Sequence, residues 1–329
     1  MRIVFFGSSD FGLPSLDALQ DCGHELVRVF TQPAHRAGRG RKPRPTKVYN
    51  WARENGVECT EAENINSPDM VRQVAECNGD LLLVIAFGQK IGDEIINMFP
   101  KGAINVHGSL LPRWRGAAPV NAAVAAGDKE TGITIITVVD KMDAGLMLGK
   151  AAIPIGPEDT AGQVHEKLAE LSPDLLLYVL EQIEQGTAVY EEQDPSQVTL
   201  APKMKKADGY IDWSQDAEVI YNKIRGFWPW PGVKADYYSG ETRKCYRVTI
   251  AKAKVVEGAE STGQYGLLDG NLNIICGKGR LQIEKLKPAG GRLMDFRDFA
   301  NGRGLKPGDI FMPIEEANSL REKQGEQIV

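Results

Sequence analysis

Short apolar runs alternate with longer amphipathic stretches over the first 200 residues. The apolar runs predict strands at residues 3–6, 26–30, 81–86, 103–106 and 134–139. The amphipathic stretches predict helices at residues 13–22, 47–55, 68–77, 119–126 and 160–185. Strands that alternate with helices are typical of a parallel sheet covered on both faces. The pattern therefore predicts an α/β fold with a doubly wound, mostly parallel, Rossmann-like sheet.

The pattern changes near residue 200. Residues 200–208, Leu-Ala-Pro-Lys-Met-Lys-Lys-Ala-Asp, have the polar, Pro-bearing character of a linker. A helix is predicted at 216–226, followed by strands at 233–237, 244–251, 263–268, 272–276 and 281–287. Five short strands with glycine turns favour a small β-barrel of the oligonucleotide-binding type. We therefore expect a first domain at 1–199, a linker at 200–208, a barrel domain at 209–314 and a polar tail at 315–329.

Composition adds little beyond the class of protein. The chain has 329 residues, of which 42% are hydrophobic and 25% charged, as in an ordinary globular enzyme. No apolar run reaches the ~20 residues that span a bilayer, and the N-terminus lacks the pattern of a signal peptide, so we expect a cytoplasmic protein. Five scattered cysteines without a CxxC pair predict free thiols. The four histidines show no ligand spacing with these cysteines, so no metal site is predicted.

Charge is distributed unevenly along the chain. The net charge of −5 argues against a nucleic-acid partner, but its distribution matters more than its total. Residues 26–53 contain eight basic residues and no acid, and residues 278–306 are also rich in basic residues. Local positive patches on an acidic protein could therefore meet a polyanion.

The candidate chemistry lies in the run Asn105-Val-His107-Gly-Ser-Leu-Leu-Pro112-Arg-Trp-Arg-Gly116, followed by Asp143. Asn105 and His107 alternate along a predicted strand end, so their side chains project to the same side. An amide, an imidazole and a carboxylate can together bind and protonate a developing oxyanion, and a substrate amine would replace a protein nucleophile. Taken singly, Asn105 and Asp143 also suit turns and His107 suits a structural role. Asp140 lies only three residues before Asp143 in the sequence, so either aspartate could be the catalytic carboxylate.

This run resembles the active site of the 10-formyltetrahydrofolate-dependent formyltransferases, and the wider chain is similar to the branch that acts on methionyl-tRNA. The resemblance implies transfer of the formyl group of 10-formyltetrahydrofolate to the α-amino group of methionyl initiator tRNA. His107 and Asn105 would stabilise the oxyanion. Asp143, which the family's Asp-Ala-Gly pattern selects over Asp140, would orient His107, favour its charged form and assist proton transfer through water.

The same resemblance implies a folate pocket with apolar walls and exposed main chain, which suits a flat pterin. Its expected residues are Ile85, Ala86, Phe87, Gly88, Gln89, Ser109, Leu110, Leu111, Pro112, Val139 and Asp140. The stretch 85–87 also fits a simple core strand. Residues 7–12 occupy the first strand-to-helix turn but lack the GxGxxG spacing of a dinucleotide site.

Residues 31–42 resemble the Ala-Gly-Arg-Gly loop with which this branch grips the acceptor end of tRNA. Gly38 and Gly40 give that backbone freedom, and Arg39 can bind a phosphate or stack on a base. The expected tRNA contacts are Arg36, Arg39, Arg41, Lys42, Lys203, Lys205, Lys206, Lys285, Lys287 and Arg292. A charged run is otherwise most often a solvated surface. The tryptophans within 225–232 favour packing between helix and barrel over base stacking.

Two other functions compete with this interpretation. A sugar-nucleotide N-formyltransferase shares the Asn-His-Asp set, but it has no use for the basic loop at 36–47. A non-catalytic RNA-binding protein would use the α/β domain as a scaffold, yet a scaffold needs none of Asn105, His107 and Asp143. We expect a monomer that binds the folate co-substrate and initiator methionyl-tRNA.

Overall fold

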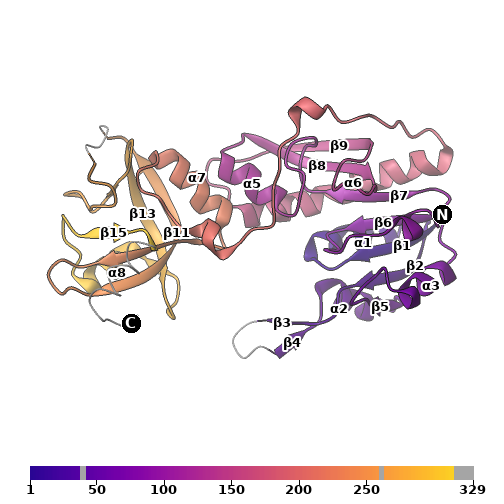
Figure 1. Cartoon of the computed structure of the whole chain (residues 1–329), viewed down its shortest axis with the longest axis horizontal. Coiled ribbons are helices and arrows are strands. Elements are labelled where there is room, and N and C mark those ends of the chain that lie inside the picture. The colour runs from indigo at the N-terminus through magenta and orange to yellow at the C-terminus, as the bar shows by residue number, and fades with distance from the viewer. Residues whose placement is uncertain (38–41, 259–262, 315–329) are drawn as a thin grey trace. The chain divides into compact units, whose positions relative to one another are not determined.

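The computed structural model describes residues 1–37, 42–258 and 263–314 (Figure 1). Arg39, Arg41 and the expected polar tail therefore lie outside the described residues. The chain divides into two compact units. The first unit comprises Met1–Pro119, Glu130–Pro154 and Gln163–Pro202, and the second comprises Val120–Lys129, Ile155–Gly162 and the described residues from Lys203 onward. The passage at 202–203 falls inside the expected linker, whereas two short segments of the expected first domain group with the second unit.

A seven-stranded sheet forms the centre of the first unit, in the order β5-β2-β1-β6-β7-β8-β9. The strands are β1 (Arg2–Gly7), β2 (Glu25–Thr31), β5 (Cys59–Glu61), β6 (Leu81–Ile85), β7 (Ala103–His107), β8 (Glu130–Thr137) and β9 (Met147–Pro154). In this order, the neighbouring strands from β5 to β7 are parallel to one another. Strand β8 is antiparallel to both of its neighbours, β7 and β9. The mostly parallel Rossmann-like sheet is thus confirmed, with β5 and β9 added to the predicted strands.

Helices α1 (Leu13–Gln20), α2 (Lys47–Glu54), α3 (Pro68–Glu76) and α6 (Ala161–Gln185) lie where the periodicity predicts helices. The short helix α4 (Asp93–Ile96) was not predicted. The side chains of Thr46 and Ser67 cap α2 and α3 by accepting main-chain N–H groups three residues ahead. Short strands β3 (His35–Ala37) and β4 (Lys42–Arg44) pair antiparallel and extend away from the main sheet of this unit (Figure 1).

The core of the first unit explains why its central strands were predictable from apolar runs. Every residue of β6 is buried, and four consecutive residues of β1 are fully buried. The ring of Phe6 lies 5.1 Å from the rings of Phe30 and Phe87. A strand buried on both faces needs a continuous apolar run, which is the pattern that the sequence shows.

The second unit is an antiparallel, nearly closed barrel with strand order β12-β13-β11-β10-β15. Its strands are β10 (Val233–Tyr238), β11 (Cys245–Val256), β12 (Ile274–Ile275), β13 (Arg280–Pro288), β14 (Met294–Asp295) and β15 (Ile310–Met312). Its helices are α5 (Pro119–Ala126), α7 (Ala217–Phe227) and α8 (Phe296–Arg303). The side chains of Trp213, Tyr237 and Phe311 fill the core of this unit.

The barrel closes in a way that the sequence pattern did not predict. The described residues 263–268 do not form the continuous strand expected there. Instead, Leu267 bridges to Ile310 of β15 and Leu268 bridges to Ile274 of β12, so this short segment joins the two edge strands. Gly266 has a φ of 82°, and a Cβ atom there would lie 2.4 Å from the carbonyl oxygen of Phe311. Backbone packed this closely requires glycine, which interrupts a strand pattern.

Candidate active site

Strand β7 presents two polar side chains on one face of the first sheet. Asn105 and His107 alternate with Ile104 and Val106, which are buried on the other face. Asn105 lies between Val84 of β6 and Ile136 of β8 and is half-buried. Its side-chain amide makes no hydrogen bond to any described residue. The amide N–H groups are therefore available as donors to a ligand.

A main-chain carbonyl fixes the imidazole of His107, which is 6% exposed. Nε2 of His107 lies 2.9 Å from the carbonyl oxygen of Trp114. Because a carbonyl oxygen can only accept, Nε2 carries the hydrogen. Trp114 has a φ of 63°, and its N–H donates to Oγ1 of Thr199 at 2.9 Å. The left-handed backbone at Trp114 is thus held from the opposite side by Thr199.

Asp143 is the carboxylate beside His107. Its Oδ2 lies 3.6 Å from Nδ1 of His107 and accepts the N–H of Gly116 at 2.8 Å. The side chain of Asp143 is only 14% exposed, and its φ is 50°, a left-handed value that is uncommon for residues other than glycine. The separation from His107 is that of an ion pair and is too long for a direct hydrogen bond.

Asp140, the competing carboxylate, has another partner. Its Oδ1 lies 2.5 Å from Nζ of Lys90, and both side chains are exposed. The hydrogen bond that the Lys90 ammonium donates to Asp140 raises the pKa of Lys90. Of the two aspartates that the sequence left open, the structure thus brings Asp143 to His107 and pairs Asp140 with a lysine.

The expected folate-binding stretch 85–89 alternates between buried and exposed residues. Ile85 and Phe87 are buried in the core, whereas Ala86 and Gly88 are exposed and have φ values of 48° and 82°. The exposed surface here therefore consists of main chain and small residues. Such a surface fits main-chain recognition of a flat heterocycle with many donors and acceptors. The side chains of Ile85 and Phe87 therefore belong to the core, as the alternative interpretation of this stretch as a simple core strand predicts.

The Gln89 side chain is occupied within the fold. Its Oε1 accepts the N–H of Ile65 at 2.9 Å, and its Nε2 donates to the carbonyl oxygen of Ala62 at 2.7 Å. Gln89 thereby holds the loop after β5, next to the exposed main chain at 86–88. Any folate contact from Gln89 would use its main chain.

The stretch 109–112 is a rigid turn. Oγ1 of Thr134 donates to the carbonyl oxygen of Ser109 at 2.7 Å and accepts the N–H of Leu111 at 3.1 Å. Leu111 packs into a small core with Ile136 and Met147, while Leu110 is only half-buried. Pro112 is buried, and the Leu111–Pro112 peptide is cis.

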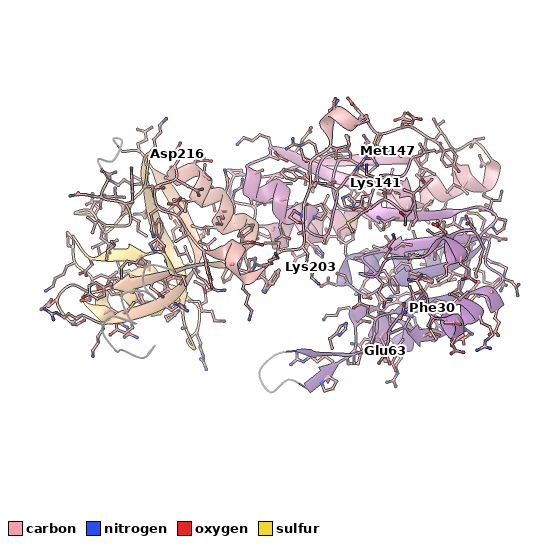
Figure 2. The ribbon with its side chains drawn as sticks, in the orientation of Figure 1. Phe30, Glu63, Lys141, Met147, Lys203 and Asp216 are labelled. Atoms are coloured by element: carbon pink, nitrogen blue, oxygen red, sulfur yellow. The ribbon has the colours of Figure 1, made fainter. Side chains whose placement is uncertain are left out.

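An exposed hydrophobic side chain follows β8. Val139, after β8, is 44% exposed. Lys141 and Met147, both labelled in Figure 2, bracket the turn that carries Asp143 along the chain. The apolar surface at Val139 and the main chain at 109–112 are the features expected of a folate site.

Six of the basic residues expected to bind tRNA have exposed side chains, namely Lys203, Lys205, Lys206, Lys285, Lys287 and Arg292. Lys203, Lys205 and Lys206 follow one another at the start of the main part of the second unit. Lys285 and Lys287 alternate along β13 and so project to the same side, with Nζ of Lys285 4.0 Å from Asp295. Arg292 is exposed between β13 and β14. Arg36 and Lys42 belong to β3 and β4, and Arg39 and Arg41 lie outside the described residues.

Sequence reasoning missed the residues that support His107 and Asp143. They are Arg115, Gln193 and Thr199. Thr199 and Gln193 bind the main chain of Trp114 and of Asp143, and the Arg115 side chain binds the side chain of Gln193. Arg115 lies within the candidate run, but nothing in its spacing indicates a partner. Gln193 is 50 residues from Asp143 along the chain, and one sequence carries no signal for such a pair.

Profiles of two known protein families match the chain. The formyl transferase profile matches residues 1–180, and the profile of the formyl transferase C-terminal domain matches residues 203–304. The first match covers more than half of the chain. The chain therefore belongs to the formyl transferase family.

Curated relatives narrow the family. The chain is 39% identical to the methionyl-tRNA formyltransferase of Methylobacillus flagellatus over 94% of this chain and 99% of that protein. It is 38% identical to the enzyme of the same name from Symbiobacterium thermophilum over 96% of both proteins. Within the family, the chain thus belongs to the methionyl-tRNA formyltransferase branch.

Solved structures share the fold. The sugar 3N-formyl transferase WlaRD, solved with dTDP and 5-N-formyl-THF, matches with a TM-score of 0.61 and 14% identity, over 86% of this chain and 97% of that chain. HypX from Aquifex aeolicus, in complex with tetrahydrofolic acid, matches with a TM-score of 0.58 and 17% identity, over 93% of this chain and 48% of that chain.

The described residues contain neither a candidate membrane span nor a candidate metal cluster. No described helix is both long and apolar enough to cross a membrane. Across 1–37, 42–258 and 263–314, no group of three or more His, Cys, Asp or Glu side chains is arranged to hold a metal ion.

Proposed function

We propose that this chain transfers the formyl group of 10-formyltetrahydrofolate to the α-amino group of methionyl initiator tRNA, with Asn105, His107 and Asp143 as its catalytic residues. The observation that carries the proposal is the grouping at the end of β7. There, Asn105 and His107 share one face of the sheet, and the Asp143 carboxylate lies 3.6 Å from the imidazole. Membership of the methionyl-tRNA formyltransferase branch supplies the identity of the acceptor.

The reaction moves one acyl group between two nitrogens. The α-amino nitrogen forms a bond to the formyl carbon, the bond from that carbon to N10 of the folate breaks, and one proton passes from the amine to N10. Negative charge gathers on the formyl oxygen as the amine attacks. The Asn105 amide and the protonated imidazole of His107 donate hydrogen bonds to that oxygen. No serine or cysteine nucleophile is required because the acceptor supplies the amine.

Asp143 and Trp114 prepare His107 for this role. The Trp114 carbonyl holds the Nε2–H, which leaves Nδ1 as the nitrogen that can respond to substrate. Asp143 faces Nδ1 at 3.6 Å, close enough to stabilise a positive imidazole and to relay a proton through one water molecule. The N–H of Gly116 keeps the carboxylate in that position.

The folate would lie against the main chain of 86–88, the turn 109–112 and Val139. Ala86 and Gly88 offer exposed main chain, and Leu110 and Val139 offer partly exposed apolar surface. The cofactor, when bound, supplies the activated formyl carbon. The protein binds the pterin and orients that carbon toward Asn105 and His107.

The acceptor separates this proposal from a sugar-nucleotide N-formyltransferase. Purified protein is incubated with 10-formyltetrahydrofolate and, in parallel, methionyl initiator tRNA, methionyl elongator tRNA or a dTDP-linked amino sugar. Folate-dependent formylation of the initiator tRNA, much faster than of the other two acceptors, is the expected result. Preferred formylation of the amino sugar would contradict the proposal.

A further inference from the structure

The side chain of Gln193 holds the turn that carries Asp143. Gln193 is 8% exposed and lies after α6, in the segment that leads to the second unit. Its Nε2 donates to the carbonyl oxygens of Asp143 and Gly145, each at 2.8 Å. Two residues earlier, Glu191 exchanges main-chain hydrogen bonds with Met147 at 2.8 and 2.9 Å. One amide therefore bonds both ends of the turn 143–145.

The other end of this amide holds the strand-like segment that carries Gly116. Oε1 of Gln193 accepts from Nε and Nη2 of Arg115 at 3.0 and 2.8 Å, and Arg115 is 8% exposed. Arg115 is fixed in turn by its main chain, which bonds Thr199 and Ala201 at 2.9 and 2.7 Å. Gln193 thus joins the turn 143–145 to the residue that precedes Gly116.

This connection sets the position of the Asp143 carboxylate from two sides. Gln193 holds the carbonyl of Asp143, and the N–H of Gly116 holds its Oδ2. The left-handed backbone of Asp143 is a conformation that persists only where the surroundings enforce it. At Gly145 a Cβ atom would lie 1.8 Å from the carbonyl oxygen of Thr137, so the turn also packs tightly against β8.

We propose that Gln193 is a positioning residue for the reaction, which sets the distance between Asp143 and His107 through the main chain of the turn 143–145. Arg115 orients the Gln193 amide so that its N–H groups face the turn. The proposal rests on the proposed catalytic role of Asp143. Substitution of side chains that orient the ligands of a metal typically lowers activity by 10- to 100-fold, and we expect a loss of the same order for a residue that orients a catalytic carboxylate.

Two substitutions separate positioning from folding. Q193E keeps an oxygen that accepts from Arg115, and this oxygen is now part of a negatively charged carboxylate. The same substitution replaces the two donated hydrogen bonds with repulsion from the carbonyl oxygens of Asp143 and Gly145. Q193A removes both sets of bonds. Q197E is the matched control, because Gln197 is exposed in the same segment and its Nε2 donates only to Asp194. Circular dichroism and thermal melting check that each variant is folded.

The decisive measurement is a double-mutant cycle on kcat. Q193E and Q193A are expected to lower kcat by about 10- to 100-fold, with KM for folate and for methionyl-tRNA changed by less than about threefold, while Q197E retains full activity. D143N with Q193A is expected to be no slower than D143N alone, because Gln193 acts through Asp143.

The outcomes distinguish the two proposals. Unchanged kcat in folded Q193E, or losses in D143N and Q193A that multiply, would overturn the positioning role while leaving the role of Asp143 intact. Full activity of D143N would instead overturn the proposed function of Asp143, and the role of Gln193 with it.

Discussion

The carbonyl oxygen of Trp114 accepts the Nε2–H of His107 at 2.9 Å, so a left-handed residue of a loop determines the tautomer of the candidate catalytic histidine. The bond leaves Nδ1 facing Asp143. The two contacts together fix the orientation of the imidazole, with one nitrogen toward a main-chain carbonyl and the other toward a carboxylate.

Substitution of the candidate catalytic residues tests that arrangement. N105A and H107A should each lower kcat by about 10²- to 10³-fold, the usual effect of removing one donor to an oxyanion. D143N should also lower kcat, because it removes the carboxylate that orients His107 and assists proton transfer. Steady-state formylation of methionyl-tRNA measures the loss. Folding and tRNA binding, followed by circular dichroism and filter binding, should remain close to those of the unmodified protein.

Activity that survives largely intact in H107A would contradict the mechanism. A large loss of tRNA binding would instead show that the substitution had damaged the fold or the acceptor site.

Metal independence gives a second prediction. In the proposed mechanism Asn105, His107 and Asp143 supply the donors and the proton relay without a Lewis acid, and no histidine has ligand spacing with a cysteine. We expect full formylation activity after exhaustive dialysis against EDTA, measured with tRNA refolded beforehand so that its own magnesium is controlled. Loss of activity that zinc or another transition metal restores would contradict this prediction.

The sequence predicts the central part of the first sheet because those strands are buried on both faces. β1 and β6 are continuous apolar runs. β9 was missed because only Met147 and Leu148 at its start are buried, and the strand then alternates between half-exposed and exposed residues at the sheet edge. Barrel closure through Leu267 and Leu268 was also missed, since isolated bridges leave no periodic pattern.

The sequence could predict the side chains of the candidate site but not the main-chain groups that hold them in place. Alternation along a strand was enough to place Asn105 and His107 on one face. The groups that hold them, however, are the Trp114 carbonyl and the Gly116 N–H, and every residue has such groups. Their position depends on left-handed backbone at Trp114 and Asp143. An aspartate is compatible with that conformation, but a tryptophan gives no sign of it.

Thiol reactivity gives a third prediction. Burial, aided by Glu61, raises the pKa of Cys59 to about 11, and burial raises the pKa of Cys276 to about 12. Only the thiolate is alkylated, so both thiols should be far less reactive at pH 8 than an ordinary cysteine. Iodoacetamide at pH 8 should modify both slowly in the native protein and rapidly in guanidinium chloride, as peptide mass spectrometry would show. Equal rates in the two states would contradict the burial of these thiols.

The tRNA contacts are best tested by single charges, because removal of the barrel would disturb more than tRNA binding. Segments 120–129 and 155–162 belong to the second unit. Asn121 donates to the Gly226 carbonyl at 2.8 Å, and Arg225 donates to the Asp159 carbonyl at 3.1 Å. A truncation after residue 207 would expose these surfaces. Loss of activity in the truncated chain would therefore not distinguish tRNA binding from folding.

We expect R39A and K287A to weaken binding of initiator tRNA while leaving folate affinity unchanged. A cation that contacts a phosphate releases about one counterion, so the slope of log affinity against log salt should fall by about one unit in each variant. Lys287 is exposed on β13, and its loss removes no ion pair of a described residue, so stability should be unaffected. Binding measured across a salt series gives both quantities. K150A serves as the charge-matched control, since Lys150 is exposed on β9 of the first sheet and makes no ion pair with a described residue. An unchanged slope in R39A, together with efficient formylation of an amino sugar nucleotide, would show that the basic loop does not bind tRNA and would favour the sugar-nucleotide acceptor.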